Sequence, residues 1–312
     1  MIRSLNLLSG GLDSTLSIRV LQEQGIEVTG LCFKTPFFGE NNAKKAAEQL
    51  GIKLIVKEVS DEHLEIIKNP KHGHGKNMNP CIDCHGFMFK KAKEIMEEEG
   101  FDIIATGEVL GQRPMSQNSK SLKIVEKIAG LEDKILRPLS ALVLPETEYE
   151  KKGLVDRKKL LDLKGKGRKP QLELAKKFGI KEFPSPAGGC KLTTKEFSDK
   201  LRTLLQKHPE AKSEVMGFMQ VGRHIWVDDT LIIVARDKED SDKMETLQKP
   251  EHFFIKMKDI PGPHAITLFL DDKDVEEIKK KAIEQIFKFK RIKERNIVFI
   301  CEYLGEKKEF IF

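Results

Sequence analysis

The stretch LNLLSGGLDS at residues 5–14 decides the fold of the first part of the chain. Its first five residues are mostly apolar and predict a buried strand, and residues 13–24 carry apolar side chains at helical spacing. Between these elements, Gly10 and Gly11 allow a tight turn whose successive backbone amides point at an anion, and the helix dipole and nearby serine hydroxyls favour the same site. The sequence therefore predicts an anion-binding loop between a first strand and a first helix.

Strands and helices alternate after this loop. Further strands are predicted at 26–33, 53–59 and 102–107, and further helices at 41–50 and 86–99. Strands that alternate with helices at this pitch form a parallel sheet covered on both faces, and ligands gather beyond the carboxyl ends of its strands. We therefore expect an α/β fold with a doubly wound parallel sheet, followed by a smaller helical and β segment and an α+β carboxy-terminal domain.

The composition fits two or three soluble domains, because the chain has 312 residues, of which 39% are apolar and 33% charged. We place the domain limits at 1–145, 146–244 and 245–312. No apolar run approaches the roughly 20 residues of a membrane-spanning helix, and the first residues do not predict a leader. Five cysteines are too few for a disulfide framework in a chain of this length. We therefore expect a cytoplasmic protein that does not bind membranes.

Basic residues cluster at 151–177. This stretch contains eleven Lys or Arg against three Asp or Glu, so the remainder of the chain is net negative although the total charge is +6. A local positive field attracts a polyanion, which favours RNA or DNA over a single nucleotide. A solvated lysine-rich surface would have the same composition, so the stretch alone does not distinguish the two.

A second group of reactive residues lies in NPCIDCH at 79–85. Cys81 and Cys84 precede a predicted helix, whose N-terminus stabilises thiolates and makes them better nucleophiles and ligands. A third cysteine, Cys190, lies on a glycine turn far downstream. CxxCH is also the pattern of c-type haem attachment, but that modification requires export. The main alternative is a structural zinc site made by the three cysteines and one histidine, with His72, His74 and His85 as candidates.

The loop motif SGGLDS, residues 9–14, is neither a Walker loop nor a dinucleotide-binding loop, because it lacks both Gly-Lys-Ser/Thr and the GxGxxG spacing. It resembles the PP-loop of the ATP-pyrophosphatase superfamily, whose members cleave ATP to AMP and pyrophosphate and adenylate a substrate oxygen. The alternative is an ordinary glycine-rich turn with Asp13 as a helix cap. The position of the motif between a strand and a helix favours the PP-loop.

Together, SGGLDS, NPCIDCH and SPAGGCKLT (residues 185–193) resemble the motifs of tRNA thiouridylases, the PP-loop enzymes that replace a uridine carbonyl oxygen with sulfur. ATGE at 105–108 resembles the family's ATGH strand end, with Glu108 in place of His. The resemblance implies that Mg²⁺ binds near Asp13 and that the polar loop at 111–117 offers Arg113 to a phosphate. The ATP contacts that it implies are Ser9, Gly10, Gly11, Leu12, Asp13, Ser14, Leu31, Phe33, Gly107 and Arg113.

Three cysteines are compatible with two sulfur-transfer mechanisms in this family. In one, a cysteine carries a persulfide and a second cysteine releases the sulfur by forming a disulfide. In the other, which we favour because both cysteines of the CxxC pair are present, Cys81, Cys84 and Cys190 hold a [4Fe–4S] cluster whose fourth iron stays open for sulfide. Cys32 and Cys301 lie on predicted strands and are expected to be core thiols.

The tail carries a second resemblance. HFFIKMKDIPGPHA at 252–265 resembles the NFACT-type RNA-binding module, and FKFKRIK at 287–293 interleaves aromatic and basic residues, which suits base stacking and phosphate contact. An amphipathic helix with solvated lysines is the alternative for the second segment. The expected RNA contacts are Lys158, Lys159, Lys166, Arg168, Lys169, Lys256, His264, Lys290 and Arg291.

The sequence thus predicts an ATP-dependent tRNA sulfurtransferase that adenylates a uridine carbonyl and inserts sulfur. Its expected partners are tRNA and a sulfur donor (a desulfurase, a sulfur carrier or free sulfide), and a homodimer is compatible with the sequence. Two other functions stay open at this point. One is a PP-loop ligase or amidotransferase that adenylates another substrate; the other is a non-catalytic RNA-binding protein with a zinc-stapled fold.

Overall fold

The computed structural model of the protein describes residues 1–185, 190–271, 274–290 and 296–312. These residues form two compact units, Met1–Ser198 and Asp199–Phe312. Arg291 and residues 186–189 of the predicted cysteine turn lie outside the described residues. Within the described residues, no helix combines the length and the apolar character that crossing a membrane requires.

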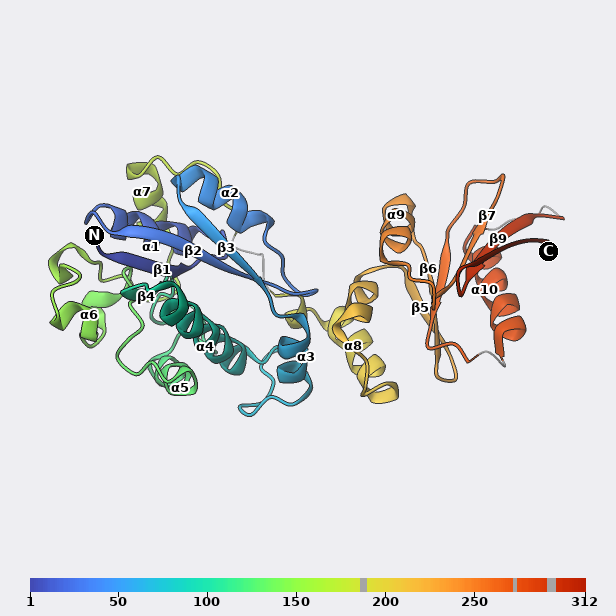
Figure 1. Cartoon of the computed structure of the whole chain (residues 1–312), viewed down its shortest axis with the longest axis horizontal. Helices are drawn as coiled ribbons and strands as arrows, with labels where there is room; N and C mark the ends of the chain where they lie inside the picture. Colours follow the sequence, from blue (N-terminus) through green and yellow to red (C-terminus); the bar gives the residue numbers. More distant parts are fainter. Residues whose placement is uncertain (186–189, 272–273, 291–295) are drawn as a thin grey trace. The chain divides into compact units, whose positions relative to one another are not determined.

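The first unit is built on a four-stranded parallel sheet (Figure 1). Its strands are β1 (Arg3–Leu7), β2 (Glu27–Lys34), β3 (Lys53–Glu58) and β4 (Ile103–Thr106), in the spatial order β3-β2-β1-β4. Leu5 on the central strand pairs with Thr29 on one side and Ile104 on the other. The predicted doubly wound α/β fold is therefore confirmed for this unit. Because the strand order reverses beside β1, ligands are expected at the carboxyl ends of β1 and β4.

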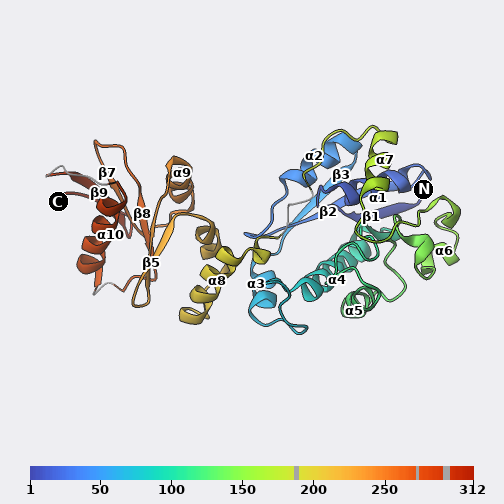
Figure 2. The same ribbon diagram turned by 180° about the vertical axis from the view of Figure 1, so that it is seen from behind.

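Helices cover both faces of this sheet (Figures 1 and 2). One face carries α1 (Leu12–Gln22), α2 (Asn41–Leu50) and α7 (Lys169–Lys177), and the other carries α4 (Cys81–Glu99) and α5 (Ser119–Ala129). Each face has its own apolar core, with Leu16 and Ala47 in the first and Phe89 and Val125 in the second. The shorter elements are α3 (Ser60–Lys68), α6 (Glu148–Lys151), η1 (Ala141–Val143), η2 (Arg157–Lys159) and η3 (Lys191–Thr193).

Two glycines allow the elements around the first loop to pack closely. Gly10 has φ +76°, and a Cβ built on it would lie 2.2 Å from the backbone carbonyl carbon of Asn42, at the start of α2. Gly107 follows β4, and its Cβ would lie 2.4 Å from the backbone nitrogen of Ser14 in α1. Real Cβ atoms do not approach backbone so closely, so only glycine fits at either position. The loop, α2 and the end of β4 therefore meet at one point.

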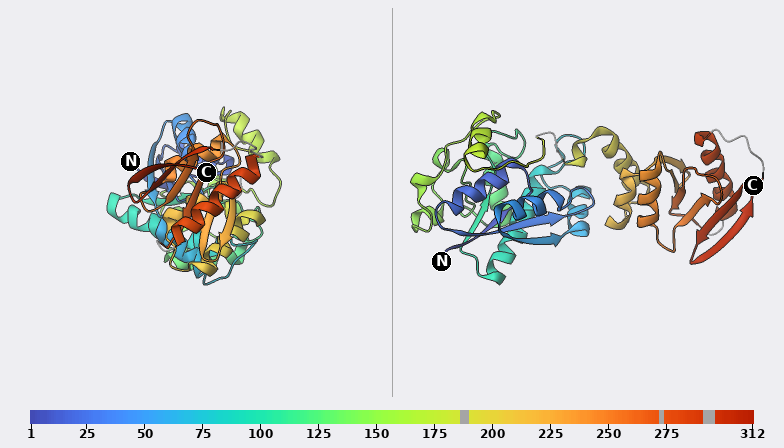
Figure 3. Two further views of the ribbon diagram at one scale, coloured as in Figure 1. Left: turned by 90° about the vertical axis from the view of Figure 1, so that its right-hand side faces the viewer. Right: turned by 90° about the horizontal axis from the view of Figure 1, so that it is seen from above.

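The second unit is an antiparallel sheet of six strands in the order β10-β9-β7-β8-β6-β5. Figure 3 shows the strands of this unit in orange and red. They are β5 (Arg223–Val227), β6 (Thr230–Val234), β7 (Phe253–Met257), β8 (Ala265–Leu268), β9 (Val298–Tyr303) and β10 (Glu306–Ile311). Its helical elements are α8 (Lys195–Lys207), which begins in the first unit, η4 (Ser213–Gln220), α9 (Lys238–Leu247) and α10 (Val275–Lys290). β6 pairs with β8, so this sheet joins strands from both sides of the predicted limit at residue 244.

The Gly10 packing predicts a loss of stability when alanine is introduced. Gly25 is a matched control, because its φ of +74° is nearly the same while a Cβ on it would meet nothing within 4 Å. We expect Gly25→Ala to lower the free energy of unfolding by about 1 to 2 kcal/mol through backbone strain alone. Gly10→Ala should cost about 3 kcal/mol or more, because the clash with α2 adds to that strain. Urea unfolding measures both values, and equal losses would contradict the described packing.

Candidate functional site

The glycine loop presents the N-terminus of α1 at the carboxyl end of β1. Ser9 Oγ accepts a hydrogen bond from the Gly11 backbone nitrogen at 3.3 Å, and Ser14 Oγ donates to the Gly11 carbonyl oxygen at 2.8 Å. No side chain caps this helix: its N-cap residue is Gly11, which has no side-chain hydrogen bond. An uncapped helix N-terminus behind a glycine turn is the geometry that binds phosphate through backbone N–H groups.

Asp13 lies in the first turn of α1, and its two carboxylate oxygens differ in their contacts. Gln112 Nε2 donates to Asp13 Oδ2 at 2.5 Å, and Arg168 Nη2 lies 3.9 Å from the same oxygen. Among the described residues, the buried Oδ1 has no hydrogen-bond partner. A buried carboxylate oxygen without a donor is costly unless something binds it, and carboxylate oxygen is what Mg²⁺ prefers. Asp13 therefore fits the role of a magnesium ligand beside a polyphosphate.

Two hydrogen bonds bring the downstream cysteine to the CxxC helix. The Met78 backbone nitrogen donates to the Leu192 carbonyl oxygen at 3.2 Å, and Asn77 Nδ2 donates to the Thr193 carbonyl oxygen at 2.7 Å. These bonds hold the segment after Cys190 against the loop that precedes α4, where Cys81 is the first helical residue and Cys84 lies in the first turn. The three thiols are close enough to affect one another's ionisation.

Burial keeps these thiols protonated at neutral pH. It raises the pKa of Cys190 to about 11, and it raises the pKa of Cys84 well above the ordinary value, with further increases from Cys190 and Cys81. Burial also raises the pKa of Cys81, against the opposing effects of Arg113 and of a hydrogen bond with Asn79. Sulfur or metal must therefore displace protons when it binds here.

A buried histidine that the sequence analysis did not identify contacts the CxxC pair. His63 on α3 is fully buried, and its Nε2 lies 3.2 Å from Cys84 Sγ. Its ring packs against Phe37 and Phe38, with ring centroids 5.7 and 5.3 Å away. Burial lowers the pKa of His63 to about 4, so the imidazole is neutral at physiological pH and can donate to a sulfur through Nε2. Nothing in the local sequence DEHLEI distinguishes it from an ordinary helical residue.

The three histidines considered as zinc ligands contact groups other than the cysteines. His72 Nδ1 lies 2.7 Å from Asp83 Oδ1, His74 Nε2 lies 2.9 Å from the Ile67 carbonyl oxygen, and His85 contacts Glu108. Within the described ranges, no three His, Cys, Asp or Glu side chains are arranged to hold a metal ion. The described part of the chain therefore gives no support to the zinc alternative. A [4Fe–4S] cluster places its own iron and sulfide atoms between its cysteine ligands, so those thiolates lie further apart than the ligands of a single ion.

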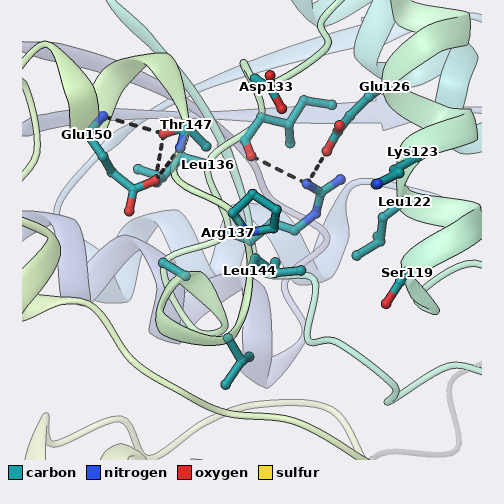
Figure 4. Close-up of a pocket in the computed structure, with 14 residues that line it drawn as sticks. Ser119, Leu122, Lys123, Glu126, Asp133, Leu136, Arg137, Leu144, Thr147 and Glu150 are labelled. Carbon is teal, nitrogen blue, oxygen red and sulfur yellow. Dashed lines mark hydrogen bonds and ion pairs between the residues drawn. The ribbon is translucent and has the colours of Figure 1, made fainter.

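Glu108, which replaces the histidine of the resembling family, is the centre of a buried ionic network. Its Oε1 lies 2.8 Å from His85 Nδ1 and its Oε2 lies 3.0 Å from Arg137 Nε, and Arg137 Nη1 donates to Glu126 at 2.5 Å (Figure 4). Burial alone would raise the pKa of Glu108, but Arg137 and the hydrogen bond with His85 hold it below its ordinary value. A cavity of about 250 Å³ lies beside Arg137, between α5 and the chain that follows it.

One loop connects the glycine loop to the thiols. Gln112 hydrogen-bonds Asp13, and the next residue, Arg113, is exposed and lowers the pKa of both Cys81 and Cys190 by its charge. The expected contact of Arg113 with a phosphate stays a prediction. The side chains of Leu31 and Phe33 are buried in the sheet, so a nucleotide could meet only the backbone of β2 there.

This arrangement can be compared with known proteins. Residues 2–144 match the ThiI family model, described as Thiamine biosynthesis protein. A tRNA-specific 2-thiouridylase of Sulfurimonas denitrificans is 40% identical over 114 residues, and one of Campylobacter curvus is 34% identical over 110 residues. Each alignment covers 32% of this chain and 32% of the relative, so the chain spans about a third of the length of these relatives.

Two solved structures show weaker similarity. A 4-thiouridine synthetase–RNA complex with bound ATP has a TM-score of 0.38 and 21% identity, covering 69% of this chain and 53% of that chain. A predicted subunit of tRNA methyltransferase from Methanocaldococcus jannaschii has a TM-score of 0.34 and 22% identity, covering 44% of this chain and 69% of that chain. The family match and the sequence relatives confirm the predicted resemblance to PP-loop thiouridylases for the amino-terminal region. The NFACT-type resemblance of the tail stays a prediction.

The expected RNA contacts fall into three groups. Lys158, Lys159, Lys166 and Lys169 are exposed on the first unit. Lys256 and His264 both face Glu245, at 2.8 and 3.6 Å, and Lys290 Nζ contacts the Pro261 carbonyl oxygen. Arg168 is paired with Asp13, and Arg291 lies outside the described residues. The exposed lysines of the first unit are therefore the members best placed to meet a polyanion.

The Glu108 network predicts a pH-dependent loss of stability in Glu108→Gln. The pKa of Glu108 in the folded protein lies below its ordinary value of 4.5, so its charge stabilises the fold above about pH 4.5 and this contribution is lost as the pH falls further. We expect the variant to lose about 3 to 5 kcal/mol at pH 7, because Arg137 loses a buried partner, and clearly less at pH 4. Urea unfolding at the two pH values measures the difference. Glu65→Gln is the control, because Glu65 forms an exposed pair with Lys68, and it should change the stability little. An equal loss of unfolding free energy in Glu108→Gln at both pH values would contradict the network.

Proposed function

We propose that this protein is an ATP-dependent tRNA sulfurtransferase, which adenylates a uridine carbonyl and replaces its oxygen with sulfur. The observation that carries the proposal is the hydrogen bond from Gln112, in the loop at 111–117, to Asp13 of the glycine loop. The charge of the adjacent Arg113 opposes the burial that raises the pKa of Cys81 and Cys190. Activation of the base and delivery of sulfur must occur at the same carbon. Two sites that share one short loop meet that requirement.

ATP binding and activation are assigned to the carboxyl ends of the strands. The pyrophosphate end of ATP would lie on residues 9–14, Mg²⁺ would use the free oxygen of Asp13, and adenine would rest against the β2 backbone. The uridine oxygen would attack the α-phosphate, giving an O-adenylated base and pyrophosphate. AMP is then a good leaving group when sulfur attacks the same carbon. The target base must leave its stack, or lie in a loop, for its carbonyl to reach this point.

Sulfur delivery is assigned to the three thiols. In the persulfide route, a terminal sulfur on one cysteine attacks the activated carbon, and a second cysteine completes the release by forming a disulfide. In the cluster route, Cys81, Cys84 and Cys190 would hold a [4Fe–4S] cluster, which would supply an open iron position for sulfide. His63 would donate to the Cys84 sulfur in either route. Iron and sulfide analysis of anaerobically purified protein distinguishes the two.

The partners follow from the same chemistry. tRNA would lie along the exposed lysines of residues 151–177, with the carboxy-terminal unit as a second contact, and the reaction would take place in the cytoplasm. A desulfurase, a sulfur carrier or free sulfide would supply the sulfur. A homodimer stays a prediction.

The thiol assignment predicts that Cys190→Ala abolishes sulfur incorporation into tRNA and leaves ATP binding unchanged. The reason is that Cys190 is assigned to sulfur delivery, whereas the pyrophosphate end of ATP is assigned to residues 9–14. Cys301→Ala is the control, because Cys301 lies on β9 of the second unit, and it should keep full activity. Mass spectrometry of digested tRNA measures thiouridine, and calorimetry measures ATP binding. Retained thiolation in Cys190→Ala would remove this residue from the mechanism.

The RNA assignment predicts that the salt dependence of tRNA binding falls when Lys158, Lys159 and Lys166 are changed together to Gln. Each lysine that contacts a phosphate contributes about one unit to the slope of log affinity against log salt, so the slope should drop by up to about three. A second triple variant, with Lys45, Lys53 and Lys57 changed to Gln, removes the same charge from other exposed positions. Equal slopes for the two variants would show that the 151–177 stretch is only a solvated surface.

A further inference from the structure

Helix α7 directs two side chains toward the glycine loop rather than toward solvent. Arg168 is the N-cap residue of α7, and its Nη2 lies 3.9 Å from Asp13 Oδ2. Gln171, in the first turn of α7, is 1% exposed and donates to Gln112 Oε1 at 3.1 Å, and Gln112 in turn donates to Asp13. α7 packs against α1 through the apolar core that includes Ala175 and Leu16. The position of these side chains is therefore fixed by the fold of the first unit.

Arg168 differs in this respect from the other cations of the basic stretch. Lys166 and Lys169, on either side of it, are exposed, whereas the Arg168 side chain is 27% exposed and faces a carboxylate. A separation of 3.9 Å is an ion pair and is too long for a hydrogen bond, so this contact does not fix the guanidinium in one hydrogen-bonded geometry. A guanidinium presents five N–H donors in a planar fork that matches phosphate oxygens.

We propose that Arg168 is a phosphate-binding residue of the ATP site, and that Gln171 and Gln112 position Asp13 beside it. This inference rests on the proposed function, since it assigns residues to the ATP site of that reaction. Without nucleotide, Arg168 balances the charge of Asp13. When Mg²⁺ and a polyphosphate enter, the carboxylate turns to the metal ion and the guanidinium turns to the phosphate oxygens. Arg168 then belongs to the nucleotide site and not to the RNA-binding surface where the sequence analysis placed it.

Two observations support a nucleotide role over a purely structural one. The buried Oδ1 of Asp13 has no partner among the described residues, so the pair with Arg168 leaves the carboxylate incompletely satisfied. The pair also lies at the N-terminus of α1. The N-cap residue of this helix, Gly11, makes no side-chain hydrogen bond, so the helix end already favours an anion. A cation, an uncapped helix N-terminus and a free carboxylate oxygen together match a magnesium polyphosphate, which carries both signs of charge.

The test compares Arg168→Gln with Lys169→Gln in the 312-residue chain, because the two neighbouring changes remove the same charge. Inorganic pyrophosphate and ATP, each with Mg²⁺, are titrated by calorimetry, and tRNA binding is measured at the same salt concentration. We expect Arg168→Gln to weaken pyrophosphate and ATP binding by at least about tenfold, the loss of one charge-assisted hydrogen bond or more. Lys169→Gln should leave both unchanged, and Arg168→Gln should lower tRNA affinity no more than Lys169→Gln does.

Each other outcome has a defined meaning. Equal pyrophosphate affinities in the two variants, or a loss confined to tRNA in Arg168→Gln, overturns the inference and leaves the proposed function standing. Failure of the wild-type protein to bind either ATP or pyrophosphate overturns the proposed function itself. Arg168→Lys keeps the charge and loses the planar fork, so it should bind pyrophosphate with intermediate affinity. If Arg168→Gln does not fold, wild-type affinity in Arg168→Lys overturns the inference.

Discussion

The hydrogen bond from Gln112 to Asp13 is the contact on which the candidate site depends. It joins the loop at 111–117 to the N-terminus of α1, and Gly107 brings the preceding residues within backbone contact of the same helix. The charge of the next residue, Arg113, opposes the rise in the pKa of Cys81 and Cys190, so the loop at 111–117 is related both to the glycine loop and to the thiols.

The glycine loop and the three thiols have different electrostatic environments. At the glycine loop, uncapped backbone amides, a guanidinium and a carboxylate with a free oxygen favour a charged, metal-bound ligand. At the thiols, burial raises the pKa values of Cys81, Cys84 and Cys190, and a neutral His63 lies against one of them. Unloaded thiols are therefore protected from oxidation, which requires thiolate. The charge of Arg113 acts to lower the pKa of Cys81 and Cys190, and so favours the thiolate form that sulfur transfer or cluster binding requires.

The sequence was sufficient where the signal is local. The strand, the two glycines and the following helix predicted the turn at the N-terminus of α1, and the CxxC pair with a distant cysteine predicted that these segments belong together. It was insufficient where a tertiary contact decides the role. His63 lies in an ordinary amphipathic helix and becomes distinctive only when Cys84 packs against it. Arg168 lies among exposed lysines, and composition cannot show which cation turns inward. Glu108 was noticed as a departure from the family's motif, but its partners His85 and Arg137 are brought to it only by the tertiary fold.

The central claim is that the ATP loop and the thiols act together on a uridine of tRNA. Mass spectrometry of nucleosides from the tRNA of cells that lack the gene tests it most directly. The account predicts that one thiouridine species disappears in these cells and returns when a wild-type copy is supplied. An unchanged content of every thiouridine with and without the gene would contradict it.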